Sequence, residues 1–332
     1  MRIPARVIVA AAVGGVVAGA AIAWSAAPLP SAAGNSRAAA ARSASPARTA
    51  RPTASPARTA AAPAGLAGPA VRAVGVPREV RARGAVLADA ATGTVLWSRD
   101  PGTERPMGSI TKVMTALLVI RAGDLGRQIQ VPKAVIGYVA KYGADSAGLH
   151  PGDILTAQQL LEAMLLPSGC DAAYTLATAY GPGMPAFLAK MNAAAKQLGM
   201  LHTQFTSPDG LPYPTESSTY STPADLLTLG EAAMESPVFR SIVGQRFYQI
   251  HRGPGHHAYW WDNTNALIGS YPGADGIKTG FTDAALHCLL FEASRGGLTL
   301  IGDVLGSPAS GPASGADAAA HVLNWGFSLP RS

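Results

Sequence analysis

Residues 85–97 read AVLADAATGTVLW, two apolar runs joined by a Thr-Gly turn. Apolar runs separated by such a turn are typical of a β-hairpin. Further strand-like runs come only near the other end of the chain, at 273–279, 286–293 and 298–305. Strands at both ends of a domain favour one antiparallel sheet to which both ends contribute.

The middle of the chain shows helical rather than strand-like patterns. The patterns cover residues 109–121, 156–166, 170–180, 183–199 and 223–235, and an Ala-rich stretch at 316–325 predicts a closing helix. An antiparallel sheet packed with a helical region is an α+β fold, and nothing here resembles a repeated βαβ unit.

Charge divides the chain of 332 residues into a basic head and a mildly acidic body. Residues 1–78 hold nine Arg and no acidic residue, which leaves 17 basic against 20 acidic residues after them. The body therefore lacks the basic surface of a nucleic-acid-binding domain, and the head lacks aromatic residues that stack on bases. We expect no nucleic-acid partner.

The head begins with an export segment. Arg2 and Arg6 precede an uncharged apolar run at 7–24, followed by small residues where cleavage can occur. Residues 1–29 are thus predicted to be either a signal peptide or a retained N-terminal membrane anchor, two alternatives that the length of the run leaves open. In both cases the basic residues keep the N-terminus cytoplasmic and place the body outside the membrane.

Residues 30–75 consist almost entirely of Ala, Pro, Arg, Ser, Thr and Gly and have no periodic apolar face. This composition predicts a disordered linker. It acts either as a solvated spacer or as a basic contact to anionic lipid or cell wall. Residues 76–332 are then the globular domain.

A Ser and a Lys lie three residues apart in GSITKVMTALLVI, residues 108–120. Ser109 and Lys112 fall on one face of the predicted helix, one turn apart. Because this helix is apolar all round, it is expected to be buried, with Lys112 in a dry environment beside the Ser109 hydroxyl. Such a Lys can act as the general base for a Ser nucleophile. The alternative is a helix N-cap Ser followed by a solvated Lys.

Lys278, Thr279 and Gly280 lie in GADGIKTGFT, residues 273–282. Glycines leave a strand edge bare, so it can pair with an extended peptide while a cation and a hydroxyl fix the peptide's terminal carboxylate. The alternative is an ordinary strand that ends in a turn.

Taken in order, the strings at 109–112, 168–170 and 278–280 resemble the S-x-x-K, S-x-N and K-T-G motifs of penicillin-binding proteins and serine β-lactamases. Within that superfamily the chain is similar to the low-molecular-mass D-alanyl-D-alanine carboxypeptidases, peptidase family S11, over about residues 84–327. LLPSGCDAA at 165–173 is one further shared string. The resemblance implies a β-lactamase-like α+β fold, no cofactor and a role in peptidoglycan synthesis and cell shape.

The same resemblance implies a serine-type hydrolase that removes the last D-Ala from peptidoglycan stem peptides. Ser109 would attack the carbonyl between the two D-alanines and form an acyl-enzyme. Lys112 would be its base, and Ser168 would help to pass the proton to the leaving amine.

The resemblance also implies that the predicted strand at 273–279 and the residues directly after it bind the substrate. Lys278 and Thr279 would hold the carboxylate of the substrate or of a β-lactam, and Gly280 completes the motif. The backbone N–H groups of Ser109 and Phe281 would form the oxyanion hole. The Glu-x-x-Leu-Asn string that deacylates class A β-lactamases is absent between 170 and 278, so β-lactams are expected to act as slowly released inhibitors.

Cys170 departs from the family pattern, which has Asn at this position of the substrate-binding motif. A thiol is a poor substitute for an amide that donates and accepts hydrogen bonds. Two alternatives to the carboxypeptidase follow: a DD-transpeptidase, or a non-catalytic penicillin-sensing or wall-binding protein.

Metal binding and disulfides are not expected. His251, His256 and His257 lie close together, but no carboxylate or further His stands at ligand spacing from them in the sequence. The two cysteines, Cys170 and Cys288, give no sign of pairing.

Overall fold

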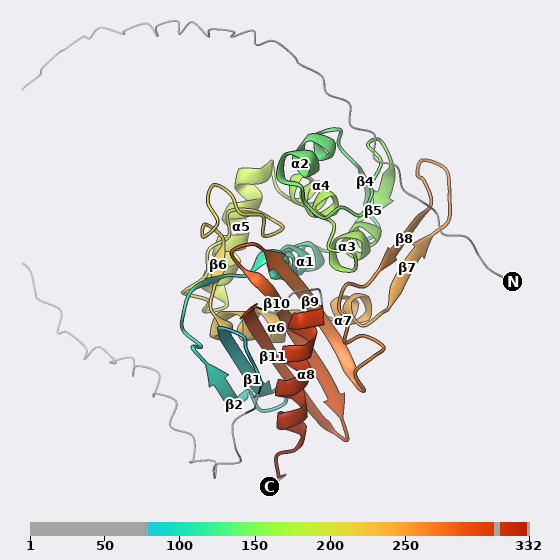
Figure 1. The fold of residues 1–332 in the computed structure, drawn as a ribbon. Helices are drawn as coiled ribbons and strands as arrows, with labels where there is room; N and C mark the ends of the chain where they lie inside the picture. Colours follow the sequence, from blue (N-terminus) through green and yellow to red (C-terminus); the bar gives the residue numbers. More distant parts are fainter. Residues whose placement is uncertain (1–76, 78, 309–312, 331–332) are drawn as a thin grey trace, which may run out of the picture. The chain divides into compact units, whose positions relative to one another are not determined.

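A computed structural model of the chain describes residue 77, residues 79–308 and residues 313–330 (Figure 1). The predicted export segment at 1–29 and the linker at 30–75 lie outside the described residues and stay predictions. No helix within the described part of the chain is long and apolar enough to cross a membrane.

A five-stranded antiparallel sheet forms the frame of the domain, in the order β2-β1-β11-β10-β9 (Figure 1). The first strand pairs with the last, and Val86 lies opposite Asp303. The prediction of one sheet built from both ends of the domain is therefore confirmed. The strands are β1 (Gly84–Asp89), β2 (Thr94–Arg99), β9 (Ala274–Thr282), β10 (Leu286–Arg295) and β11 (Leu298–Ser307).

Each face of the sheet is covered by helix. The closing helix α8 (Ala313–Phe327) lies across one face, where Leu87, Phe291 and Leu323 share a buried cluster (Figure 1). Helix α6 (Pro223–Met234) packs on the other face, against β1, β10 and β11. Covering both faces removes the apolar side chains of β1, β10 and β11 from water, which is the main stabilising term for such a layered domain.

Helix α1 (Lys112–Ala122) is the centre of the helical region. It contacts five other helices, and its residues 112–117 and 119 are all buried, as its uniformly apolar sequence predicts. The five helices around it are α3 (Ala157–Leu165), α4 (Cys170–Tyr180), α5 (Met184–Gln197), α6 and α7 (Pro237–Val243).

The short and exposed elements were not predicted. Helix α2 (Ala134–Tyr142) reads AVIGYVAKY, and so short an apolar run does not distinguish a helix from a strand. Only Val135 of this helix is buried. Helix α7 is too short for a periodic pattern. Three two-stranded sheets were also not predicted: β3 (Arg105–Pro106) with β6 (Tyr220–Ser221), β4 (Gln128–Gln130) with β5 (Ile154–Thr156), and β7 (Phe247–Ile250) with β8 (Tyr259–Asp262).

Candidate active site

Ser109 lies on a tight turn between the sheet and the central helix. The predicted helix at 109–121 begins instead as the 3₁₀ turn η1 (Gly108–Thr111), and α1 follows from Lys112. Gly108 has a φ of 54°, and a Cβ there would lie 2.8 Å from the backbone N of Phe281. Only glycine fits both the left-handed conformation and this close approach. The turn that carries Ser109 is therefore pressed against the backbone of β9.

Lys112 is fully buried, and its ammonium nitrogen reaches Ser109. Nζ lies 2.7 Å from Ser109 Oγ and 3.1 Å from the carbonyl oxygen of Asp209. It also lies 3.4 Å from both Ser168 Oγ and Cys170 Sγ. The expectation of a Lys in a dry environment beside the Ser hydroxyl is met, and polar partners surround the buried nitrogen, as a buried charge requires.

Ser168 is held in an unusual backbone conformation directly before helix α4. Its φ is 68°, in the left-handed region that residues other than glycine seldom adopt. Strained backbone of this kind is found preferentially at functional sites. Here it accompanies a buried hydroxyl directed at Lys112 Nζ.

Cys170 begins helix α4 and is 2% exposed. Burial raises the pKa of its thiol to about 12, although the charge of Lys112 acts in the opposite direction. The side chain is therefore a neutral thiol at physiological pH, which excludes a thiolate nucleophile. The hydroxyl of Ser109, beside the Lys112 amine, is then the candidate nucleophile of the site.

The loop that carries Asp209 was not predicted as part of the site. Thr115 Oγ1, one helical turn after Lys112, donates to the Pro208 carbonyl at 2.6 Å, and Tyr138 donates to the Asp209 carboxylate at 2.8 Å. The Asp209 carbonyl is thereby fixed where Lys112 needs an acceptor. A backbone acceptor has no side-chain signal, and only the turn-forming string SPDG at 207–210 marks it in the sequence.

Lys278, Thr279, Gly280 and Phe281 follow one another on the edge strand β9. Lys278 is 1% exposed and donates to the carbonyl and hydroxyl oxygens of Thr279 at 3.1 and 3.2 Å. Burial, reinforced by the charge of Lys112, lowers the pKa of Lys278 to about 7. A Cβ on Gly280 would lie 2.3 Å from the Met107 carbonyl oxygen, so glycine alone lets this strand approach the Ser109 turn.

Two cavities meet at Ser109. One of about 260 Å³ is lined by Ser168, Thr264, Thr279 and His287, and the other of about 310 Å³ by Cys170, Gly210, Glu216 and Asp283. Ser109, Asp145 and Phe281 line both cavities. A hydroxyl with an amine beside it at the junction of two cavities has an arrangement that suits acyl transfer, with room for the acyl part on one side and the leaving group on the other.

The fold brings together all the predicted site residues and adds several that sequence reasoning missed. Ser109, Lys112, Ser168 and Cys170 form one contact cluster. Beyond the Asp209 loop, the structure adds Asp145, Thr264 and His287 to the cavity walls. Thr264 Oγ1 lies 2.7 Å from Thr279 Oγ1, and the His287 ring packs 4.7 Å from that of Phe281.

The comparison with known families agrees with this geometry. A model of the family described as D-alanyl-D-alanine carboxypeptidase matches residues 70–309. The chain belongs to this family. The D-alanyl-D-alanine carboxypeptidase of Streptomyces sp. (strain K15) is 41% identical over 250 residues, covering 72% of this chain and 84% of that protein. DacB2 of Mycobacterium tuberculosis is 38% identical over 247 residues, covering 74% and 81%.

Solved structures of family members have the same fold. The Streptomyces K15 DD-transpeptidase superimposes with a TM-score of 0.72 at 38% identity, over 76% of this chain and all of that one. The D-alanyl-D-alanine carboxypeptidase of Mycobacterium tuberculosis gives 0.71 at 35% identity, over 78% and 96%. The predicted penicillin-binding α+β fold is confirmed, as is the family-level prediction of a serine-type D-alanyl-D-alanine carboxypeptidase.

Proposed function

We propose that Ser109 carries out the family's reaction in this chain, cleaving the terminal D-Ala from peptidoglycan stem peptides through an acyl-enzyme. The observation that carries the proposal is the 2.7 Å contact between Ser109 Oγ and Lys112 Nζ in a buried setting. A Ser hydroxyl is a weak nucleophile until a base takes its proton, and Lys112 is the only side chain in the cluster that can serve as that base.

The surroundings of Lys112 direct its lone pair toward Ser109. When Lys112 acts as the base it has given up one proton, and its two remaining N–H donors face the Asp209 carbonyl on one side and Ser168 and Cys170 on the other. A carbonyl oxygen can only accept, so it holds an N–H donor in place. The lone pair is then free to accept the Ser109 proton as Oγ bonds to the substrate carbonyl carbon.

The remaining steps use the other residues of the site. The backbone N–H groups of Ser109 and Phe281 stabilise the oxyanion, a contribution worth about 100-fold or more in rate per donor. Ser168 relays the proton from Lys112 to the departing D-Ala amine, which breaks the C–N bond. Water then hydrolyses the ester on Ser109, with Lys112 again acting as base.

Lys278 and Thr279 are proposed to hold the substrate's terminal carboxylate. Their strand is an edge strand of the sheet, so an extended peptide can pair with it. The hydroxyl of Thr279 lines the first cavity beside Ser109. The same pair would bind the carboxylate of a β-lactam, whose ring opening would leave a slowly released adduct on Ser109.

Transpeptidation is a second candidate activity, and Cys170 is the observation that favours it. Its side chain lines the second cavity, where Asp145, Glu216 and Asp283 supply acidic groups that attract an amine acceptor. A neutral thiol at this position offers only weak hydrogen bonds to substrate or water. An acyl-enzyme that water attacks slowly has time to react with an amine.

Residues 1–29 are proposed to export the domain and either to be cleaved or to tether it to the membrane. The support is the uncharged run at 7–24 behind Arg2 and Arg6. The basic linker at 30–75 is proposed to lie near anionic lipid or wall polymers. The enzyme would then meet its substrate at the outer face of the membrane.

Release of D-Ala from an N-acylated peptide ending in D-Ala-D-Ala tests the proposed function. The full chain should release D-Ala, and Ser109→Ala should abolish release while keeping the thermal transition of the wild type. Adding glycine as acceptor measures transfer, because the transferred product differs in mass from the hydrolysed one. A folded wild type without hydrolysis or transfer would support the non-catalytic, penicillin-sensing alternative.

A further inference from the structure

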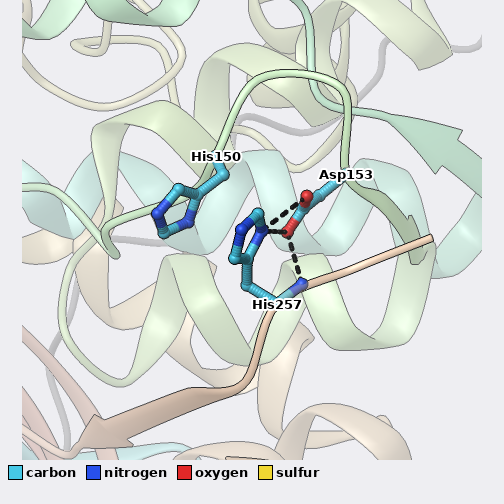
Figure 2. A group of neighbouring side chains, drawn as sticks. All are labelled: His150, Asp153 and His257. Carbon is cyan, nitrogen blue, oxygen red and sulfur yellow. Dashed lines mark hydrogen bonds and ion pairs between the residues drawn. The ribbon is translucent and has the colours of Figure 1, made fainter. Parts of the chain in front are cut away.

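Two loops that are distant in sequence meet at His150, Asp153 and His257 (Figure 2). His150 and Asp153 precede strand β5, whereas His257 lies in the connection between β7 and β8. None of the three lines either cavity beside Ser109. The cluster therefore has no part in the proposed peptidase chemistry.

Asp153 is the buried anchor of the cluster. Its carboxylate accepts from the backbone N–H of His257 at 2.8 Å and lies 2.9 and 3.0 Å from His257 Nδ1 (Figure 2). Tyr259 also donates to it. These hydrogen bonds, which come from the β7–β8 side, hold the buried carboxylate in position to act as a ligand.

The two imidazoles lie side by side on the solvent side of Asp153. The rings of His150 and His257 stack with centroids 4.0 Å apart and planes inclined by 19°. His150 is exposed and the side chain of His257 is 44% exposed, so an ion in solution can reach both rings.

We propose that His150, Asp153 and His257 form a binding site for a divalent transition-metal ion of the zinc class. One potential ligand atom from each residue lies within 4.8 Å of the others. Two imidazoles and one carboxylate are a ligand set that Zn²⁺ and Cu²⁺ accept, whereas Mg²⁺ and Ca²⁺ prefer oxygen alone. Water would occupy the fourth position.

The geometry of the cluster needs only a small change to hold the ion. Ligand atoms around a tetrahedral Zn²⁺ lie about 3.3 Å apart, given bonds of about 2.0 to 2.1 Å. His257 Nδ1 and Asp153 Oδ1, 2.9 Å apart, are already close to that spacing, with a proton where the ion would lie. His150, the exposed member of the cluster, must move further. A metal lies in the plane of each imidazole that binds it, so the His150 ring must leave its stacked position on the His257 ring.

Sequence spacing gave no sign of this cluster. Neighbours of His257 in the sequence offer no carboxylate, and its partners stand 107 and 104 residues earlier, at 150 and 153. Only the fold brings them together. Binding would tie the loop before β5 to the β7–β8 connection.

Calorimetric titration of the full chain with ZnCl₂ at pH 7.5 tests the proposal. All seven histidines lie at or after residue 150, so the basic head adds no imidazole. We expect one ion per chain with micromolar affinity. His150→Gln and His257→Gln should each weaken binding by about 10-fold or more.

His251→Gln is the matched control, because His251 is an exposed histidine of the same hairpin outside the cluster. Its affinity for Zn²⁺ should equal that of the wild type. Should His257→Gln fail to fold, His150→Gln decides the matter, since its side chain is exposed. The proposal would be overturned if His150→Gln bound Zn²⁺ as tightly as the wild type, or if His251→Gln lost as much affinity as the cluster variants. It would also be overturned if the wild type did not bind one Zn²⁺ per chain.

Discussion

The lowered pKa of Lys278 predicts how activity depends on pH. Burial and the charge of Lys112 bring that pKa to about 7, against about 10.4 for an ordinary Lys. Below pH 7 the side chain is an ammonium that can hold the substrate carboxylate. Above pH 7 it becomes a neutral amine and the ion pair is lost, so substrate capture should decline as pH rises.

The expected size of the effect comes from the fraction of enzyme that keeps the charge. With a pKa of about 7, roughly a tenth of the molecules carry a charged Lys278 at pH 8 and roughly a hundredth at pH 9. The value of kcat/KM reports the free enzyme. It should therefore fall by about 10-fold for each pH unit on the alkaline side.

This alkaline decline in kcat/KM is measured by following the release of D-Ala from an N-acylated D-Ala-D-Ala peptide from about pH 5.5 to about 9.5. Lys278→Gln should have low kcat/KM throughout and no decline that begins near pH 7. Lys190→Gln removes an exposed Lys that donates to the Tyr180 carbonyl and should keep the wild-type profile. A wild-type decline centred above pH 9, or an unchanged decline in Lys278→Gln, would refute the assignment.

Further predictions concern the packing and chemistry around Ser109. Gly280→Ala places a Cβ 2.3 Å from the Met107 carbonyl oxygen. The substitution should lower the free energy of unfolding by about 1 to 3 kcal/mol and abolish acylation. A variant as active as the wild type would contradict the close approach of the strand to the Ser109 turn. Ser168→Ala should slow acylation by about 100-fold with an unchanged thermal transition, and full-rate acylation would remove Ser168 from the proton path. Cys170→Asn should raise the ratio of hydrolysis to transfer to glycine, measured by product mass, and an unchanged ratio would show that the thiol does not set it. Burial raises the pKa values of Cys170 and Cys288 to about 12 each, so iodoacetamide at pH 7.5 should label neither in the folded protein, whereas rapid labelling of Cys170 would show a reactive thiol.

The sheet and the central helices follow from the sequence because their patterns are driven by burial. The strands at 286–293 and 298–305 were predicted within two residues of β10 and β11, since both strands are apolar over most of their length. Helix α4 was predicted at its observed bounds. Helix α2 was missed although seven of its nine residues are apolar, because a run of nine residues does not distinguish a helix from a strand.

The candidate site was predictable where its chemistry lies in side chains close in sequence. Ser109 and Lys112 are one turn apart, and their contact follows from helix geometry. The Asp209 carbonyl could not be predicted, since every residue has one. The partners of His257 were missed for a different reason: two loops more than 100 residues apart meet only once the sheet and helices have placed them.

The most direct test of the central claim is intact-mass spectrometry of the full chain after incubation with benzylpenicillin, beside Ser109→Ala. We predict a mass increase of one penicillin per chain on the wild type and none on the variant, because the Ser109 hydroxyl lies 2.7 Å from the buried amine of Lys112 at the junction of the two cavities. A folded wild type that stays unmodified, or an adduct that persists in Ser109→Ala, would contradict the account.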